Sequence, residues 1–303
     1  MEESAALKRD NETLKKQGLF VGLVTLDMIY LTAGVPQNNQ KIVASDSMIN
    51  AGGPATNAAI AFSSLGNHST LLGAVGQHPL TAIVYEELEQ YGVAIADLDP
   101  HRTEPPPLSS IIVTQATGDR AVISINATKS QILGDRLPLD SWEKFNIVLI
   151  DGHQMSVSQR IAQISHARTI PVVLDGGSWK PGFETLLPFI DYALCSSNFH
   201  PPNCHNASEV FTYLAHLGIP HIAITNGENP IQYLSQGIPG WVEVPKVKAV
   251  DTLGAGDIFH GAFCHYILQE TFPRALASAA KIASSACEVL GTRQWMNLTS
   301  SPS

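Results

Sequence analysis

An aspartate next to three small residues is the most informative feature of this 303-residue sequence. In AVDTLGAGDIFHGAFCHYIL, residues 249–268, Gly254, Ala255 and Gly256 precede an apolar pattern of helical period. Small residues let a backbone approach an anion closely, and the first N–H groups of a helix have no partner within it. Asp257, in the first turn, could accept the proton of an attacking hydroxyl. This arrangement suits phosphoryl transfer to an alcohol, although a carboxylate at this position also favours the helix dipole without any chemistry.

A second glycine-led segment, GGPATNAAIAFSSLG at residues 52–66, opens another predicted helix. Gly52 and Gly53 permit close backbone contact with a ligand, while Asn57 offers both a donor and an acceptor, as a sugar hydroxyl requires. Neither segment contains GxxxxGK[ST] or GxGxxG. The sequence therefore lacks the P-loop and the dinucleotide-binding fingerprint.

Polar residues directly follow three predicted strands. They are Asp151-Gly152-His153, Asp175-Gly176-Gly177 and Thr225-Asn226-Gly227. In an open parallel sheet, ligands bind outside the carboxyl ends of the strands. Each triplet alone is more typical of a turn or a helix cap, but their repetition at equivalent strand ends favours a site there.

The elements that must position these residues follow from the hydrophobic pattern. From residue 146 onward, short apolar runs alternate with segments of helical period, which predicts a Rossmann-like, doubly wound and mainly parallel α/β sheet. Residues 19–31 are predicted to form one buried strand. Asn206 and Glu209 are spaced as a helix start with a reciprocal cap. We expect one domain over residues 18–303, preceded by a charged, solvated tail at residues 1–17.

Two segments interrupt this alternation and read as extended chain. They are residues 28–50 and residues 109–126, the second with a Gly118-Asp119 turn suited to a hairpin. The Pro run before the second segment excludes a helix or a central strand there. We therefore expect a small β-sheet set beside the main sheet, built from two separate stretches of sequence.

Composition excludes several classes of partner. The chain has 18 Lys+Arg against 27 Asp+Glu and no basic run, so a nucleic-acid partner is not expected. No apolar run reaches the roughly 18 residues of a membrane helix, so we expect a soluble protein. Its four cysteines form no CxxC pair, which favours a reducing cytoplasm. His200, Cys204 and His205 lie in a Pro-rich stretch that is more typical of a surface loop than of a metal site.

GGPATNAA and DTLGAGD together resemble the two signatures of the ribokinase (PfkB) family of carbohydrate and nucleoside kinases. The resemblance covers nearly the whole chain from about residue 18. It implies a Rossmann-like domain with a β lid that closes over a sugar, ATP as the phosphoryl donor, Mg²⁺ on the phosphates and often a monovalent cation such as K⁺. VGLVTLDMIYL, LDGG, FHGAF and GTRQW look most like the ketose-directed branch, which includes ketohexokinase and sulfofructose kinase.

The resemblance also implies roles for individual residues. Asp257 would be the catalytic base, and Gly254, Ala255 and Gly256 the anion hole. The sugar hydroxyls would be held by Asp27, Gly53 and Asn57, with Asn126 reaching in from the lid. His153 would also face the sugar, at a position where a sulfosugar kinase is expected to offer an arginine. Thr225 and Gly227 would line the nucleotide, and Asp251 and Thr252 match the monovalent-cation loop.

The sequence departs from the family pattern at two places. The Asn-x-x-Glu motif, which helps to organise Mg²⁺, would begin at Asn198, and Pro201 then stands where the acid should be. After Gly227 the nucleotide segment lacks its second glycine and continues into Pro230. Metal handling and the grip on ATP are therefore expected to differ from the family pattern.

The sequence thus predicts ATP-dependent phosphorylation of a primary or anomeric hydroxyl of a small sugar or sugar derivative. Two alternatives stay open: a nucleoside kinase, and a catalytically weak sugar-binding or regulatory protein that kept the fold. Against the first, residues 28–50 offer only Tyr30 as an aromatic wall for a base. An exposed lid face would be a natural surface for a homodimer.

Overall fold

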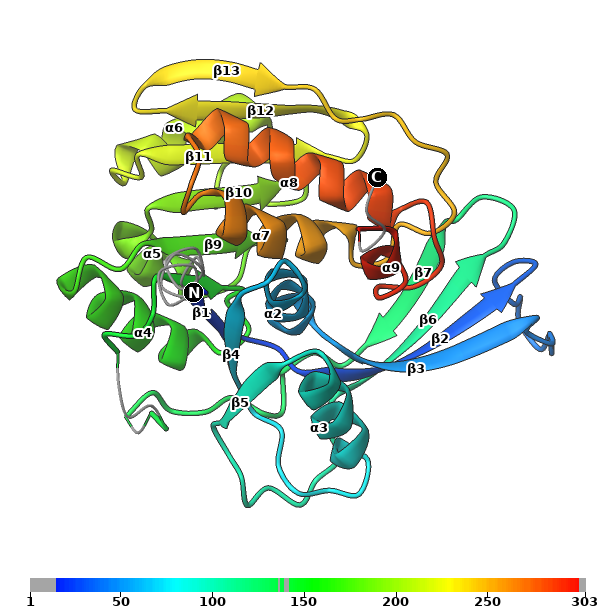
Figure 1. Cartoon of the computed structure of the whole chain (residues 1–303). Coiled ribbons are helices and arrows are strands. Elements are labelled where there is room, and N and C mark those ends of the chain that lie inside the picture. The colour runs from blue at the N-terminus through cyan, green and yellow to red at the C-terminus, as the bar shows by residue number, and fades with distance from the viewer. Residues whose placement is uncertain (1–14, 136, 139–141, 300–303) are drawn as a thin grey trace, which may run out of the picture.

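A nine-stranded sheet forms the centre of the molecule in the computed structural model, which describes residues 15–135, 137–138 and 142–299 (Figure 1). The strand order is β13-β12-β11-β10-β9-β8-β1-β4-β5. The parallel strands are β1 (Gln17–Val21), β4 (His68–Gly73), β5 (Val93–Asp97), β8 (Ile147–Ile150), β9 (Val172–Gly176), β10 (Tyr192–Ser196) and β11 (His221–Asn226). An antiparallel hairpin, β12 (Asn229–Ser235) and β13 (Ile238–Val242), closes one edge. The predicted tail lies almost wholly outside the described residues.

Helices cover both faces of this sheet, as predicted. One face carries α2 (Pro54–Ser64), α3 (Thr81–Gln90), α7 (Ala255–Tyr266) and α8 (Phe272–Ala286), followed by the short α9 (Trp295–Thr299). The other carries α4 (Met155–Ala167), α5 (Phe183–Leu186), a 3₁₀ turn (Leu187–Phe189) and α6 (Ala207–His216). Alternate residues of β8 serve the two cores, with Leu149 in one and Val148 in the other. This burial on both faces explains why the strands are continuously apolar.

Helix α6 begins at the predicted cap, with one difference. The Asn206 side chain accepts a hydrogen bond from the Glu209 amide at 3.0 Å. The Glu209 carboxylate accepts mainly from the amide of His205 and more weakly from that of Asn206. The return side of the cap therefore spans two residues.

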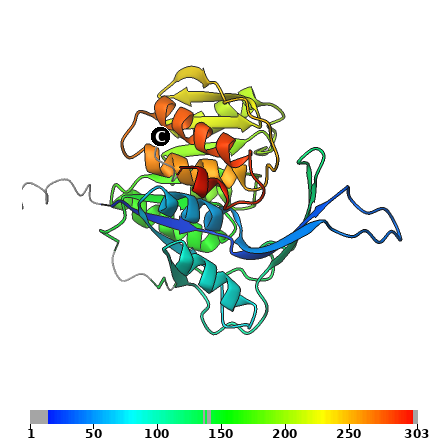
Figure 2. The same cartoon turned by 45° about the vertical axis from the view of Figure 1, so that its right-hand side comes forward.

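A second, four-stranded sheet projects from the main body (Figure 2). Its order is β3-β2-β6-β7, from β2 (Thr25–Thr32), β3 (Asp46–Gly52), β6 (Leu108–Thr114) and β7 (Arg120–Ser124). We call it the small sheet. It comes from two separate stretches of sequence, as predicted, and Gly118 takes a left-handed φ of 70° in the turn between β6 and β7. Its inner face packs Ile29, Ile111 and Val113 against Leu253 and Leu290 of the main body.

The prediction of a single strand over residues 19–31 was wrong. The stretch divides at Gly22 into β1 of the main sheet and β2 of the small sheet. A Cβ on Gly22 would lie 2.0 Å from the Asp151 carboxylate, which accepts the amide of Leu23 at 2.8 Å. A buried carboxylate from β8 thus fixes the point at which the chain leaves one sheet for the other.

No helix among the described residues combines the length and the apolar character needed to cross a membrane.

The four-stranded projection and the nine-stranded core meet along β2 and β3, at the segment that leads into α2. The two glycine-led segments singled out in the sequence both start helices on the same face of the main sheet.

Candidate functional site

The two glycine-led segments meet at a hydrogen bond between side chains 200 positions apart. Asn57 on α2 donates through Nδ2 to Oδ2 of Asp257 on α7 at 2.8 Å. Asn57 is 5% exposed, and Asp257 is partly exposed at the first turn of its helix. Packing of α2 against α7 brings the segments together, because Gly261 of α7 lies so close to Ala58 that a Cβ would meet its carbonyl oxygen at 2.3 Å.

The start of α7 presents two free amides beside this carboxylate. Gly254 is the N-cap with a left-handed φ of 67°, and a Cβ there would lie 2.6 Å from the Thr292 side chain. The Ala255 amide is turned toward the carbonyl of Thr252 at 3.3 Å. Within the described residues, the amides of Gly256 and Asp257 have no backbone acceptor. Such orphan donors at a helix N-terminus are suited to an anion.

Asp257 sits in an environment that favours its neutral form. Burial raises its pKa to about 7, and the negative charge of Asp175 acts in the same direction. The hydrogen bond from Asn57 and the charge of His260 oppose this rise. A carboxyl group with a pKa near neutrality is matched to general-base catalysis at physiological pH.

Asp27 lies on β2 against the first glycine segment, where a Cβ on Gly52 would collide with its carboxylate. Burial is the main reason that its pKa is raised, while hydrogen bonds from Thr25 and Ser109 counteract the rise. The oxygen of the Ser109 hydroxyl lies 3.3 Å from that of Ser124, whose own hydroxyl donates to the side-chain oxygen of Asn126 at 3.0 Å. Two serines therefore connect Asn126, which is exposed and has a φ of 50°, to Asp27.

The turn into α2 is held by backbone contacts and by a buried acid. Gly53 is the N-cap with a φ of 101°, and a Cβ there would lie 2.3 Å from the carbonyl oxygen of Leu23. The Asp151 carboxylate accepts the amides of Leu23, Ala55 and His153 at 2.8, 3.2 and 2.8 Å. Asp151 is 1% exposed and joins three segments around the site.

Sequence reasoning missed a buried arginine that fixes Asn57. Arg293 donates through Nη1 to Oδ1 of Asn57 at 2.9 Å, and its Nε pairs with Glu87 of α3 at 2.7 Å. Its Nη2 donates to the carbonyl of Ala51 at 2.6 Å, and Glu87 accepts the amide of the same residue. The ion pair thus provides hydrogen-bond partners for the carbonyl and the amide of Ala51 on the edge strand β3, where the small sheet joins the main body. A lone arginine after the small-residue helix, in GTRQW, was the available signal.

The remaining strand-end residues lie further along the same edge. His153 is half-buried, and burial lowers its pKa, which keeps the imidazole neutral at pH 7. Thr225 is the penultimate residue of β11 and directs its hydroxyl toward the carbonyl of Cys195 at 3.4 Å. Gly227 occupies the following turn with a φ of 56° and open space around it. No hydrogen bond within the described residues links these three to Asp257.

The loop before α7 is tied to two other parts of the chain. The two carboxylate oxygens of Asp251 accept the amides of Leu253 and Gly291, each at 2.9 Å. Arg120 of β7 donates to the carbonyl and hydroxyl oxygens of Thr252 at 2.9 and 2.7 Å. The small sheet therefore contacts this loop directly. Both oxygens of Thr252 accept bonds from a guanidinium, so they do not offer an open cation site in this conformation.

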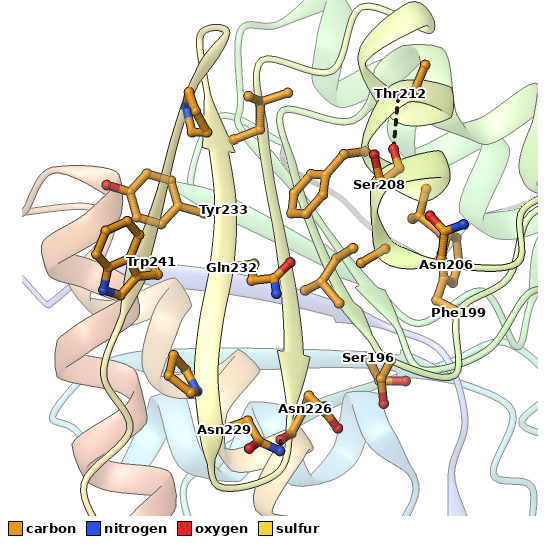
Figure 3. Close-up of a pocket in the computed structure, with 18 of the residues that line it drawn as sticks. Ser196, Phe199, Asn206, Ser208, Thr212, Asn226, Asn229, Gln232, Tyr233 and Trp241 are labelled. Carbon is orange, nitrogen blue, oxygen red and sulfur yellow. Dashed lines mark hydrogen bonds between the residues drawn. The ribbon is translucent and has the colours of Figure 1, made fainter.

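A groove of about 1290 Å³ lies elsewhere, between α6 and the β11–β13 edge (Figure 3). Gln232 and Trp241, partners across the β12–β13 ladder, line it together with Asn226 and Asn229 at the hairpin turn. It includes none of the residues around Asp257. Among the described residues, no group of three or more His, Cys, Asp or Glu side chains could hold a metal ion, His200, Cys204 and His205 included.

Comparisons with known proteins match the chain to one family and to several relatives. The model of the pfkB family of carbohydrate kinases matches residues 15–298. A ribokinase from Lactococcus lactis is 24% identical over 253 residues, 80% of this chain and 81% of its own. A mouse ketohexokinase is 22% identical, with 91% and 98% covered.

Solved structures share the fold. A putative ribokinase from Agrobacterium tumefaciens superposes with a TM-score of 0.78 at 24% identity, covering 94% of this chain and 98% of that one. Arabidopsis thaliana ribokinase, solved with ribose and ATP, has a TM-score of 0.73 at 21% identity, with 95% and 99% covered.

Proposed function

Since this chain belongs to the pfkB family of carbohydrate kinases, we propose that it transfers the γ-phosphoryl group of ATP to a hydroxyl of a small sugar, with Asp257 as the general base. The observation that carries the proposal is the contact between Asn57 and Asp257 beside the free amides of Gly256 and Asp257. In this proposal one place in the fold would supply an amide for the alcohol, a base for its proton and backbone N–H groups for an anion.

The reaction proposed for the site is a single displacement at the γ-phosphorus of ATP. The Asp257 carboxylate takes the proton of the sugar hydroxyl, whose oxygen attacks the γ-phosphorus while the bond to the β,γ-bridging oxygen breaks. ADP leaves with that electron pair. The helix start at Gly254, Ala255 and Gly256 would form the anion hole, and the free amides of Gly256 and Asp257 would face the charge on the transferred group.

The sugar is placed against the small sheet. Its hydroxyls would be bound by Asp27, Gly53 and Asn57, and Asn126 would contact them from the small sheet. Ser124 and Ser109 connect Asn126 to Asp27. His153, neutral at pH 7, offers a hydrogen bond but no charge to a substrate. We therefore propose an uncharged sugar, and the ketose-directed branch as the first to test.

ATP would lie along the carboxyl edge of the sheet, with Thr225 and Gly227 lining it. Because the described residues contain no protein cluster for a metal, Mg²⁺ would be held mainly by the nucleotide phosphates, whose charge it neutralises when bound. Asp251 and Thr252 mark the loop matched to a monovalent cation, K⁺. Their oxygens already accept protein donors, so a cation would require the loop to rearrange.

The rival readings differ in measurable ways. Tyr30, the aromatic residue expected to stack on a base, lies on the face of β2 opposite to Asp27, by the alternation of the strand, and is 39% exposed. This position weakens the case for a nucleoside kinase. A sugar-binding protein without turnover would be stabilised by its sugar and would release no ADP.

The test is ADP release by the purified chain with ATP and Mg²⁺ against a panel of ketoses, aldopentoses, aldonic acids and nucleosides. Thermal-shift measurements on the same panel report binding independently of turnover. We expect stabilisation and ADP release with the same uncharged sugar. Thermal stabilisation without ADP release would instead support the binding protein, and turnover confined to nucleosides would support the nucleoside kinase.

We further propose that the small sheet is a lid and that its outer face joins two copies of the chain. Residues of that face are apolar and exposed on three strands: Tyr30 at 39%, Ile49 at 52% and Ile123 at 74%. The Ile123→Glu substitution should convert a dimer to a monomer in analytical ultracentrifugation, with Val43→Glu, in the loop before β3, as control. A parental monomer at micromolar concentration would rule the dimer out.

The four free cysteines are compatible with a cytoplasmic location.

A further inference from the structure

A histidine one turn after Asp257 has acceptors on both of its ring nitrogens. His260 is 6% exposed. Its Nδ1 lies 2.7 Å from the carbonyl oxygen of Gly256, and its Nε2 lies 3.2 Å from that of Leu194 on β10. A carbonyl oxygen cannot donate, and a neutral imidazole carries only one N–H. Both contacts are therefore hydrogen bonds only when the ring carries two protons and a positive charge.

A carboxylate that can balance this positive charge lies next to the ring. Asp175, the penultimate residue of β9, is 5% exposed, and its Oδ2 lies 3.5 Å from Nδ1 of His260. That oxygen has no hydrogen-bond partner within the described residues. A buried carboxylate without a partner is costly, and a facing cation is the usual compensation. The two side chains thus lie at ion-pair distance beneath the first turn of α7, and they form a buried ion pair when the ring carries both protons.

The other titratable groups around the pair leave this assignment intact. Cys195 of β10 and Cys264 of α7 are buried, and burial raises the pKa of both thiols far above neutrality, so they stay uncharged. His153, after β8, is neutral because burial lowers its pKa. The charge of Asp27 on the small sheet raises the pKa of Asp257 as well, and is the smallest of the influences on it. Lys180 and Asp151 act with Asp175 on His153. Among the groups that the structure describes around the pair, Asp257 has a pKa of about 7, so its charge is the one that the pair can alter near that pH.

We propose that Asp175 and His260 are a positioning pair that sets the charge of Asp257. Asp175 favours the protonated carboxyl group, and His260 favours the carboxylate. This inference rests on the proposed function, because it assigns the pair to the base of that reaction. The charge of Asp175 retains the proton on Asp257, and the charge of His260 releases it. The bond from His260 to the Gly256 carbonyl also fixes the peptide whose N–H belongs to Asp257, one of the two free amides.

Opposite substitutions give opposite results in this account. Asp175→Asn should move the acid limb of the kcat/KM profile to lower pH by at least about half a unit. His260→Asn should move it to higher pH by a similar amount, and the double variant should return it toward the parental position. Asp191→Asn is the matched control: it alters an acid at the amino end of the neighbouring strand, where Asp191 binds the Val172 amide at 2.8 Å. It should leave the limb unmoved.

A second readout needs no activity. The ¹⁵N NMR spectrum of the His260 ring in the folded protein should show both nitrogens protonated at pH 7 in the parent. A ring with one unprotonated nitrogen would overturn the ion pair, whether or not a sugar substrate has been found. Limbs that shift in the same direction in both single variants, or not at all, would overturn the tuning role. If the parent turned over no sugar although its His260 ring carried both protons, the proposed function would be refuted and the ion pair would stand.

Discussion

Arg293 and Asn57, 236 positions apart, determine which way an amide points in the site. The guanidinium has only donors, so the atom of Asn57 that faces it at 2.9 Å must be the oxygen. The amide nitrogen is then directed to Asp257, and its second N–H has no acceptor among the described residues. Since the same guanidinium holds Glu87 and the Ala51 carbonyl, the joint of the small sheet and the orientation of Asn57 are coupled.

Replacing Arg293 should therefore impair both sugar binding and stability. Arg293→Gln leaves Glu87 buried without its cation, and breaking a buried pair costs about 3–5 kcal/mol. We expect a lower midpoint in urea unfolding and a sugar KM raised at least tenfold in the folded protein. Arg274→Gln, an exposed arginine on α8, is the control and should change neither value. A stability loss with an unchanged KM would assign Arg293 to folding alone.

Asp27 should contribute to sugar binding and not to ATP binding. Removing its carboxylate leaves ligand hydroxyls unpaired in a partly buried site, which costs about 1–3 kcal/mol. Asp27→Ala should raise the sugar KM at least tenfold and leave the KM for ATP unchanged in steady-state kinetics. Asp46→Ala, an exposed acid of β3 in the same sheet, serves as the comparison. An unaltered sugar KM in Asp27→Ala would remove this residue from the pocket.

The raised pKa of Asp257 predicts how activity and stability depend on pH. A base with a pKa of about 7 is protonated below that value, so kcat/KM should fall about tenfold per unit as the pH drops below it. The folded state retains this proton between about pH 4 and 7, where the unfolded state has released it. Stability should therefore decrease as the pH rises through that window. A kcat/KM profile that is flat from pH 5.5 to 8 would contradict the assignment.

The small sheet should become ordered when sugar binds. Its inner face has few buried apolar residues of its own, so its strands depend on contacts with the main body. Hydrogen exchange in β2, β3, β6 and β7 should slow with sugar, while that in β1 and β8 stays unchanged. Slowing confined to the main sheet would show that the projection is not a lid.

The main sheet was predictable because its strands are buried on both faces and therefore apolar throughout. The two glycine-led segments were predictable for a different reason, since their small residues report local backbone needs such as the left-handed φ of Gly254. The small sheet's origin in two stretches followed from turn and proline signals. These features depend on local sequence alone.

What the sequence did not reveal depends on distant partners. The end of β1 at Gly22 is imposed by Asp151, whose carboxylate fills the space beside it. Arg293 in the turn before α9, Glu87 of α3 and Asn57 of α2 form one network only in the fold. His260 looks like any residue of an apolar helix until the carbonyl of Leu194 is placed against it. No local pattern encodes such contacts.

The Asp257→Asn variant tests the central claim most directly. Asparagine keeps the shape and removes the basicity, and a positioned carboxylate contributes about 10² to 10⁴ in rate. The backbone amides of Gly256 and residue 257 are unchanged, and a negative charge near them is removed. Binding of ATP should hold or strengthen, and the melting temperature at pH 8 should hold or rise.

The decisive measurement is kcat of purified Asp257→Asn with its best sugar, alongside dissociation constants for sugar and ATP. We predict a kcat reduced at least a hundredfold with both dissociation constants near parental, because chemistry is lost and binding is retained. A kcat above about a tenth of the parental value would contradict the assignment of Asp257 as general base.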